Sequence, residues 1–213
     1  MKKIFMALCA LCLWASPSQA QEETISPFLF DEYKEATVFM GMNQVRGKMN
    51  FYMPTGEFLY IDESDNNRVK ILAEPEKVSM IRFGSRIFLP SVKRGVEVLS
   101  SEPTFYVQYN ASIRDKGKIV GYGGTSLIGN VKSYSVNNSG TGYVSDPVKL
   151  VVGQLYKVYY IGKKQKEIRS MNQLLKYYSK HQEELESYIK EKGIHFDDAL
   201  QMLQLVQYAH SLK

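Results

Sequence analysis

The residues with the clearest capacity for binding chemistry lie in one Gly-rich segment of this 213-residue chain. Residues 117–145 include seven Gly, five Ser and three Asn. A loop this long is usually either functional or disordered, and large aromatic rings have little reason to occur in it unless they pack or bind. Tyrosine rings beside lysines would suit an envelope protein or an anionic glycan as partner. The predicted ligand-binding residues are Tyr122, Tyr134, Tyr143, Lys116, Lys118 and Lys132.

Known catalytic motifs are incomplete in this sequence. The glycines around 121–124 lack the Lys-Ser/Thr pair of a phosphate-binding loop, and no βαβ pattern surrounds them. Ser187 and Lys190 have the spacing of a nucleophilic S-x-x-K motif, but its partner motifs are missing and the residues lie on an amphipathic helical pattern. We therefore predict no catalytic residue from motifs.

Metal-ligand patterns are equally weak. His181, His195 and His210 are 14 and 15 residues apart, which is not a zinc spacing, so we expect core or edge histidines. An oxygen-rich run begins at Asp62, but Asn67 stands where a calcium-binding EF-hand loop needs Gly. The sequence predicts neither a metal site nor a cofactor.

Paired carboxylates leave an enzymatic alternative open. A glycan or peptidoglycan hydrolase needs two carboxyl groups about 5 to 9.5 Å apart across a cleft. Sequence spacing cannot show whether such a pair converges. The candidates are Asp31, Glu32, Glu57, Glu97 and Glu102.

The N-terminus has the pattern of a secretory signal peptide. Lys2 and Lys3 precede a twelve-residue apolar run, and Ser18 and Ala20 place small side chains before an expected cleavage after residue 20. We expect the chain to be exported and to be periplasmic or extracellular. No further apolar stretch approaches 18 residues, so no transmembrane segment is expected after cleavage.

Removal of residues 1–20 changes the chemistry available to the protein. It takes away Cys9, Cys12 and Trp14, so disulfides and thiolate nucleophiles are excluded from the mature chain. The net charge falls from +5 to +3, which is too mild a balance to indicate nucleic-acid binding. The sequence does not indicate an oligomeric state.

The segments that must position these residues follow a β pattern up to about residue 166. Short runs of alternating or β-branched residues are separated by turns, and connections this short favour antiparallel pairing. The predicted strands are Ala36–Met40, Arg46–Tyr52, Glu57–Asp62, Arg68–Leu72, Arg86–Leu89, Val96–Leu99, Phe105–Ala111, Val148–Val152 and Tyr156–Ile161.

Helical periodicity begins after Lys166. Ser170 and Gln173 form a capping box before a first helix, and Gly193 is a good C-cap for a second. Asp197 is expected to cap a third helix, which would bury the face that carries Leu200, Leu203, Val206 and Ala209. The predicted class is α+β: an antiparallel β-rich body (sheet, sandwich or open barrel) over residues 21–166, then about three helices over 167–213.

Several quoted segments together resemble a family of small exported Bacteroidetes proteins with no assigned activity. They are "KEATVFMGMNQVRGKMNFY", "PTGEFLYID", "RIFLP", "RDKGKIVGYGGTS" with "VKSYS", and the tail "LLKYYSKHQEELESYIKEKGIHFDDALQMLQLVQY". The resemblance implies an envelope location and assigns no site residues. Our leading hypothesis is a non-catalytic binding or structural protein of the cell envelope; the alternative is the paired-carboxylate hydrolase.

Overall fold

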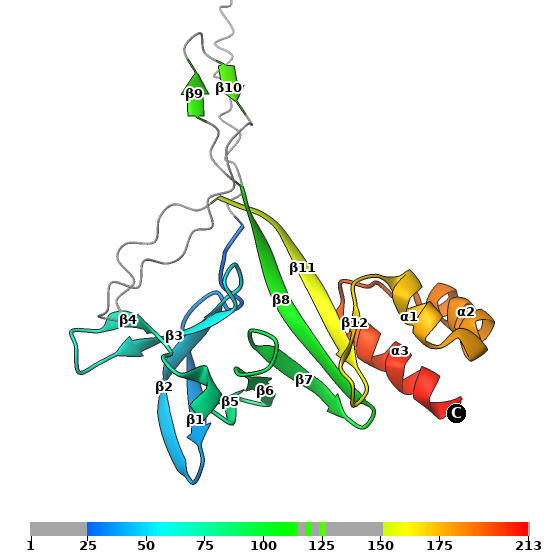
Figure 1. The fold of residues 1–213 in the computed structure, drawn as a ribbon, viewed down its shortest axis with the longest axis horizontal. Helices are drawn as coiled ribbons and strands as arrows, with labels where there is room; N and C mark the ends of the chain where they lie inside the picture. Colours follow the sequence, from blue (N-terminus) through cyan, green and yellow to red (C-terminus); the bar gives the residue numbers. More distant parts are fainter. Residues whose placement is uncertain (1–24, 115–117, 121–123, 127–150, 213) are drawn as a thin grey trace, which may run out of the picture.

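The computed structural model describes residues 25–114, 118–120, 124–126 and 151–212 (Figure 1). In these ranges ten strands form one antiparallel sheet in the order β12-β11-β8-β7-β6-β5-β1-β2-β3-β4, and β9 and β10 pair separately. The strands are β1 (Lys34–Met40), β2 (Asn43–Tyr52), β3 (Glu57–Asp62), β4 (Arg68–Ile71), β5 (Met80–Phe83), β6 (Arg86–Leu89), β7 (Val96–Ser101), β8 (Thr104–Arg114), β9 (Lys118–Val120), β10 (Gly124–Ser126), β11 (Val151–Ile161) and β12 (Lys166–Ile168).

The α+β class and the antiparallel pairing are confirmed. Residues 148–150 of the predicted strand Val148–Val152 lie outside the described residues. Its last two residues and the predicted strand Tyr156–Ile161 are not separate elements, because β11 continues between them through an irregular register from Val152 to Leu155. The strand β5 was not predicted, because its four residues contain Arg82 and are too short to give a clear alternation. The 3-10 turn η1 (Pro75–Lys77) precedes it.

One row of directly opposed residues crosses the sheet and identifies its inner face. Opposed residues on neighbouring antiparallel strands lie on the same face. Starting at β2, the row contains Val45, Val38, Ile81, Phe88, Glu97, Val107, Tyr159 and Ile168. Every member except Val45 is buried. The inner face therefore holds the core along most of the sheet and loses its cover at the β2 end.

An aromatic cluster fills the middle of the inner face. The rings of Phe51 and Phe58 have centroids 4.8 Å apart, and those of Phe83 and Phe88 are 5.5 Å apart. Gly95 packs against this cluster with φ +85°, and a Cβ there would lie 2.9 Å from the Phe51 ring. A side chain at this position would be excluded by both the backbone angle and the packing.

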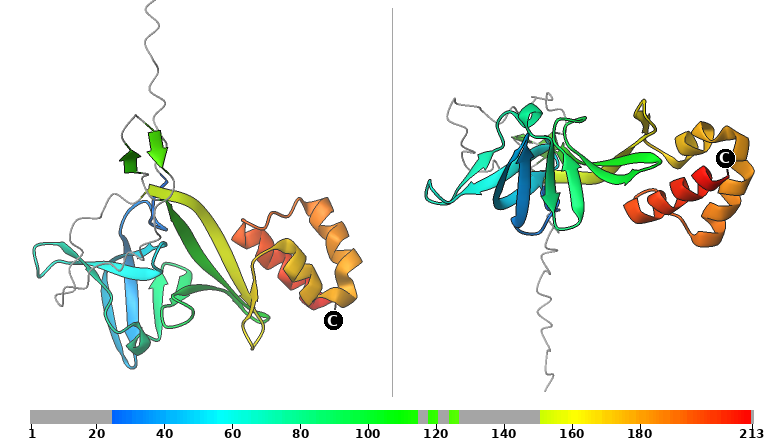
Figure 2. Two further views of the ribbon diagram at one scale, coloured as in Figure 1. Left: turned by 45° about the horizontal axis from the view of Figure 1, so that its top comes forward. Right: turned by 90° about the horizontal axis from the view of Figure 1, so that it is seen from below.

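Three helices cover the same face at the other end of the sheet, beside β8, β11 and β12 (Figure 2). They are α1 (Met171–Tyr177), α2 (Gln182–Lys192) and α3 (Ala199–Ser211), with the 3-10 turn η2 (Ser179–His181) between the first two. Ser170 caps α1 as predicted, and Gly193 ends α2 with φ 62°. Leu185 of α2 and Met202 of α3 are fully buried in this cluster.

The start of α3 differs from the prediction. Asp198, rather than Asp197, accepts hydrogen bonds from the N–H groups of Leu200 and Gln201, at 2.9 and 3.0 Å. The predicted inward face was wrong for Leu200, whose side chain is 68% exposed. The buried residues of α3 are Met202, Leu205, Val206 and Ala209.

The segment before α3 attaches the helices to the sheet. Tyr159 of β11 stacks on Phe105 with ring centroids 5.3 Å apart and meets Phe196 edge to face at 5.1 Å. Its hydroxyl donates a hydrogen bond of 2.8 Å to the carbonyl of Phe196. Lys157 donates a hydrogen bond to the carbonyl of Asp197.

Among the described residues, no helix is long and apolar enough to cross a membrane.

Candidate functional site

Most of the loop residues predicted to bind a ligand lie outside the described residues. They are Tyr122, Tyr134, Tyr143, Lys116 and Lys132. Lys118 begins β9, which pairs antiparallel with β10. The role of this segment therefore stays a prediction.

The candidate carboxylates of the hydrolase reading occupy different environments. Glu97 is buried on the inner face and forms a bidentate ion pair with Arg86, with nitrogen–oxygen distances of 2.7 and 2.8 Å. Glu57 accepts a 2.6 Å hydrogen bond from Thr55, while Asp31 and Glu32 are exposed. Glu102 is also exposed. The hydrolase reading remains a hypothesis, with Glu97 committed to a structural ion pair.

Metal-ligating side chains do not gather in the described part of the chain. It contains no group of three or more His, Cys, Asp or Glu residues arranged to hold a metal ion. His195 and His210 are exposed rather than in the core, and His181 is half-buried.

The uncovered end of the inner face forms a groove of about 560 Å³ over β1, β2 and β3. This volume falls within the roughly 300–1,000 Å³ typical of small-molecule sites. The apolar lining consists of Val38, Met40, Val45, Gly47, Met49, Tyr60, Ile61 and Leu72. The polar lining consists of Glu35, Arg46, Lys48, Asp62, Glu63 and Ser64.

Gly47 gives the groove its depth. It lies in the interior of β2 opposite Ala36, so two of the smallest residues face each other across the strands. A Cβ built at Gly47 would meet no atom within 4 Å. Glycine weakens a strand interior and often marks a place where a ligand approaches the backbone closely. Gly41, Gly84 and Gly193 also face open space, but their positive φ angles favour glycine. At Gly47 neither φ nor packing requires glycine.

Two methionines contribute flexible walls. Met49 is buried at the inner end of the groove, and Met40 is partly exposed at its outer end. Unbranched thioether side chains adapt to irregular apolar ligands. The groove therefore combines an apolar, adaptable lining with an open centre.

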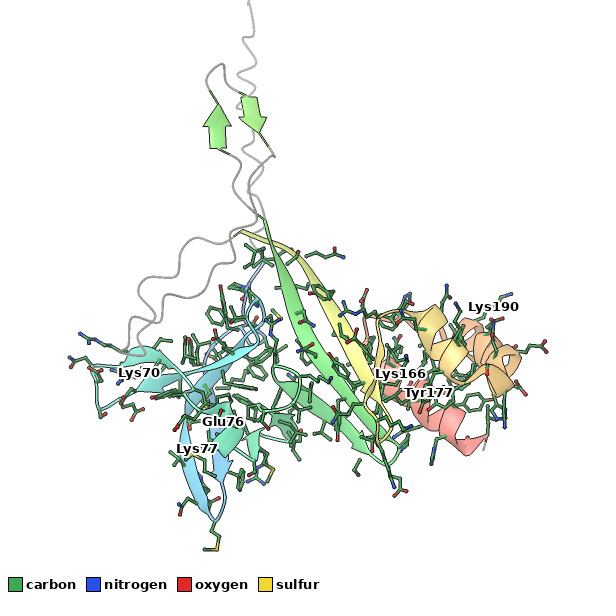
Figure 3. All side chains as sticks on the ribbon, in the orientation of Figure 1. Lys70, Glu76, Lys77, Lys166, Tyr177 and Lys190 are labelled. Atoms are coloured by element: carbon green, nitrogen blue, oxygen red, sulfur yellow. The ribbon has the colours of Figure 1, made fainter. Side chains whose placement is uncertain are left out.

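A charge network borders the groove at the end of β3, where Asp62 belongs to both. Lys70 of β4 (Figure 3) contacts Asp62 at 2.6 Å and Asp65 at 3.0 Å. Hydrogen bonds from Lys70 and Ser64 lower the pKa of Asp62 to about 2. Asp62 is therefore ionised at neutral pH and is unsuited to act as a general acid, which needs a raised pKa.

Sequence reasoning missed this groove. Gly47 interrupts a strand pattern of otherwise ordinary alternation, and that glycine was the one signal that could have pointed to the site. The rest of the lining comes from β1, β2 and β3, whose registers bring it together, and from Glu63, Ser64 and Leu72 just beyond strands β3 and β4.

Searches of protein-family models, curated proteins and solved structures gave no match to this chain.

Proposed function

We propose that this chain is an exported, non-catalytic binding protein of the cell envelope, and that its groove holds the apolar chain of an amphiphile. The observation that carries the proposal is the open space at Gly47 in the middle of an apolar groove. The export part rests on the signal-peptide pattern of residues 1–20.

The apolar lining favours an apolar chain, and an unpaired edge of β2 makes an added peptide strand the second candidate. β2 is paired with β1 from Asn43 to Met49 but with β3 only from Met49 to Tyr52. Among the described strands, the second edge of residues 43–48 is therefore unpaired, and a peptide that binds by adding a strand needs such an edge. The apolar lining residues favour a ligand that gains mainly from burying apolar surface.

The lining also favours an apolar chain over a sugar. Sugars stack on aromatic rings and need many hydrogen-bonding groups. The groove has one aromatic side chain, Tyr60, in its lining. The oxygens of Asp62 already accept hydrogen bonds from Ser64 and Lys70. The floor from Val45 to Met49 extends about 13 Å along β2, which suits a linear molecule.

Gly47→Val tests this function. The added side chain enters open space, so it should fill the groove without disturbing the strand. We expect isothermal titration calorimetry with dodecanoate to show at least a tenfold weaker affinity in the variant. Because valine suits a strand interior better than glycine, the free energy of unfolding should rise by roughly 0.5–1 kcal/mol.

Thr37→Val provides the matched control. Thr37 is not among the residues that line the groove, and its substitution introduces the same valine side chain into β1 in place of an isosteric polar one. It should leave dodecanoate affinity unchanged. Equal affinity of the wild type and Gly47→Val, or no binding by the wild type, would contradict the proposed use of the groove.

A further inference from the structure

The groove opens at an exposed apolar tip. The β1–β2 hairpin projects beyond the neighbouring strands at the lower edge of Figure 1, and Gly41 forms its turn with φ +59°. Met42 is fully exposed at this turn, and Val45 is 52% exposed. Met40 is partly exposed and lines the groove together with Val45. A projecting group of apolar side chains is unusual on a surface that contacts water alone.

The outer face of the hairpin continues the apolar tip. Phe39 lies opposite Met80 of β5, and both are half-buried. One row further from the tip, Thr37 lies opposite Arg46 on one side and Arg82 on the other. Both arginines are exposed. Apolar side chains therefore occupy the end of the hairpin, and a pair of cations lies directly behind them.

Acidic residues lie outside this pair of rows. Residues 36–47 contain no Asp or Glu, and the next row inward sets Glu35 opposite Lys48. The turn η1, beside the β1–β5 pair, adds Glu76 and Lys77 (Figure 3), and Glu74 is its N-cap residue. Lys77 forms an ion pair with Glu74. The excess of positive charge is therefore concentrated in the arginine row nearest the tip.

We propose that the tip of the β1–β2 hairpin docks on an anionic lipid surface. Met42 and its apolar neighbours would enter the boundary between headgroups and acyl chains, and Arg46 and Arg82 would contact the phosphates. This layering, with apolar side chains outermost and cations behind, is typical of interfacial membrane anchors. Each arginine near an anionic surface adds about a fivefold gain in affinity.

The continuity between tip and groove supports a lipid surface over a protein partner. Met40 and Val45 belong to both, so a docked tip would bring the open end of the groove to the depth of the acyl chains. This part of the argument rests on the proposed function. Docking itself does not require the groove to be occupied.

The test places the chain's sole tryptophan at the tip. Trp14 is the single Trp of the sequence and lies in the predicted signal peptide. The full-length chain is expressed, the protein is purified as the cells process it, and mass spectrometry confirms that residue 14 is absent. The fluorescence of Met42→Trp should shift to the blue with vesicles of phosphatidylcholine and phosphatidylglycerol. The same substitution at exposed Leu200 on α3 should give no shift.

Two further variants measure affinity by vesicle co-sedimentation. Met42→Glu should weaken binding at least tenfold, because it places a charge where an apolar side chain would enter the membrane. Arg46→Gln should weaken it about fivefold on vesicles that contain phosphatidylglycerol and leave it unchanged on pure phosphatidylcholine. No blue shift for Met42→Trp, or wild-type binding by Met42→Glu, would overturn the proposal.

The outcomes separate docking from groove binding. Gly47→Val should still dock on vesicles, and Met42→Glu should still bind dodecanoate. If the wild type binds dodecanoate but does not bind vesicles, the docking proposal is refuted and the proposed function is not. If the wild type binds vesicles but does not bind dodecanoate, the proposed function is refuted and docking is supported.

Discussion

At the scale of single residues, small differences in surroundings decide what each polar group can do. Asp62 and Glu97 are both carboxylates with cationic partners, yet Asp62 borders the groove and Glu97 lies buried in the inner face. Asp62 is held ionised by Lys70 and Ser64. Gly47 contributes by lacking a side chain. The candidate site therefore depends on an open position and a fixed charge rather than on a reactive group.

The pKa of Asp62 gives a prediction at this scale. Its folded value of about 2 is below the ordinary value of 3.8, so the ionised form is favoured by folding. The stabilisation is fully present above the ordinary value and is lost as the pH falls through about 2. Carbon-13 NMR of the Asp62 carboxyl should show a midpoint near 2, and Lys70→Met should raise it. A wild-type midpoint near 4 would contradict the network.

At the scale of elements, one polar cluster joins strands β6, β7 and β8 at the boundary between the two main cores. Arg86 pairs with Glu97 and lies 5.0 Å from the ring centroid of Phe30. The Tyr109 hydroxyl donates a 2.6 Å hydrogen bond to Glu97. Burial and the adjacent Glu97 carboxylate raise the pKa of Tyr109, so its hydroxyl stays protonated as a donor. Tyr109 packs against both the aromatic cluster and the helix-covered cluster.

Removal of the Glu97 charge should destabilise the fold. Glu97→Gln keeps the shape of the side chain but leaves Arg86 without its charge partner, at a cost of roughly 2–4 kcal/mol. Urea denaturation would measure this loss. Glu167→Gln, which removes an exposed pair with Arg169, should change stability by less than about 0.5 kcal/mol. Equal effects of the two substitutions would refute a special role for the buried pair.

At the scale of the whole molecule, the fold covers its inner sheet face unevenly. Helices cover one end, the aromatic cluster covers β5, β6 and the adjacent parts of β2 and β3, and the groove occupies the part of β1 and β2 nearer their hairpin turn. The row of opposed residues shows this uneven cover, because Val45 at its β2 end is exposed and the other members, through to Ile168, are buried. An apolar groove at the uncovered end of this face is a natural place for an apolar ligand.

Much of this architecture was predictable from local pattern. Alternation gave most strands, and Ser170 and Gly193 set helix ends that the structure confirms. The bulge in β11 and the exposure of Leu200 depend on tertiary packing, which period alone does not encode. The groove depends on the strand registers and on the absence of helices over this part of the inner face. The local sequence around Gly47 does not indicate which part of the sheet the helices leave uncovered.

The most direct test of the account is to locate a bound acyl chain by NMR. With the methyl groups of methionine labelled with carbon-13, dodecanoate should give intermolecular nuclear Overhauser effects to Met40 and Met49, at the two ends of the groove. Met202, buried beneath the helices, should give none. Contacts confined to methyl groups elsewhere, or no contacts at a saturating concentration, would contradict the central claim.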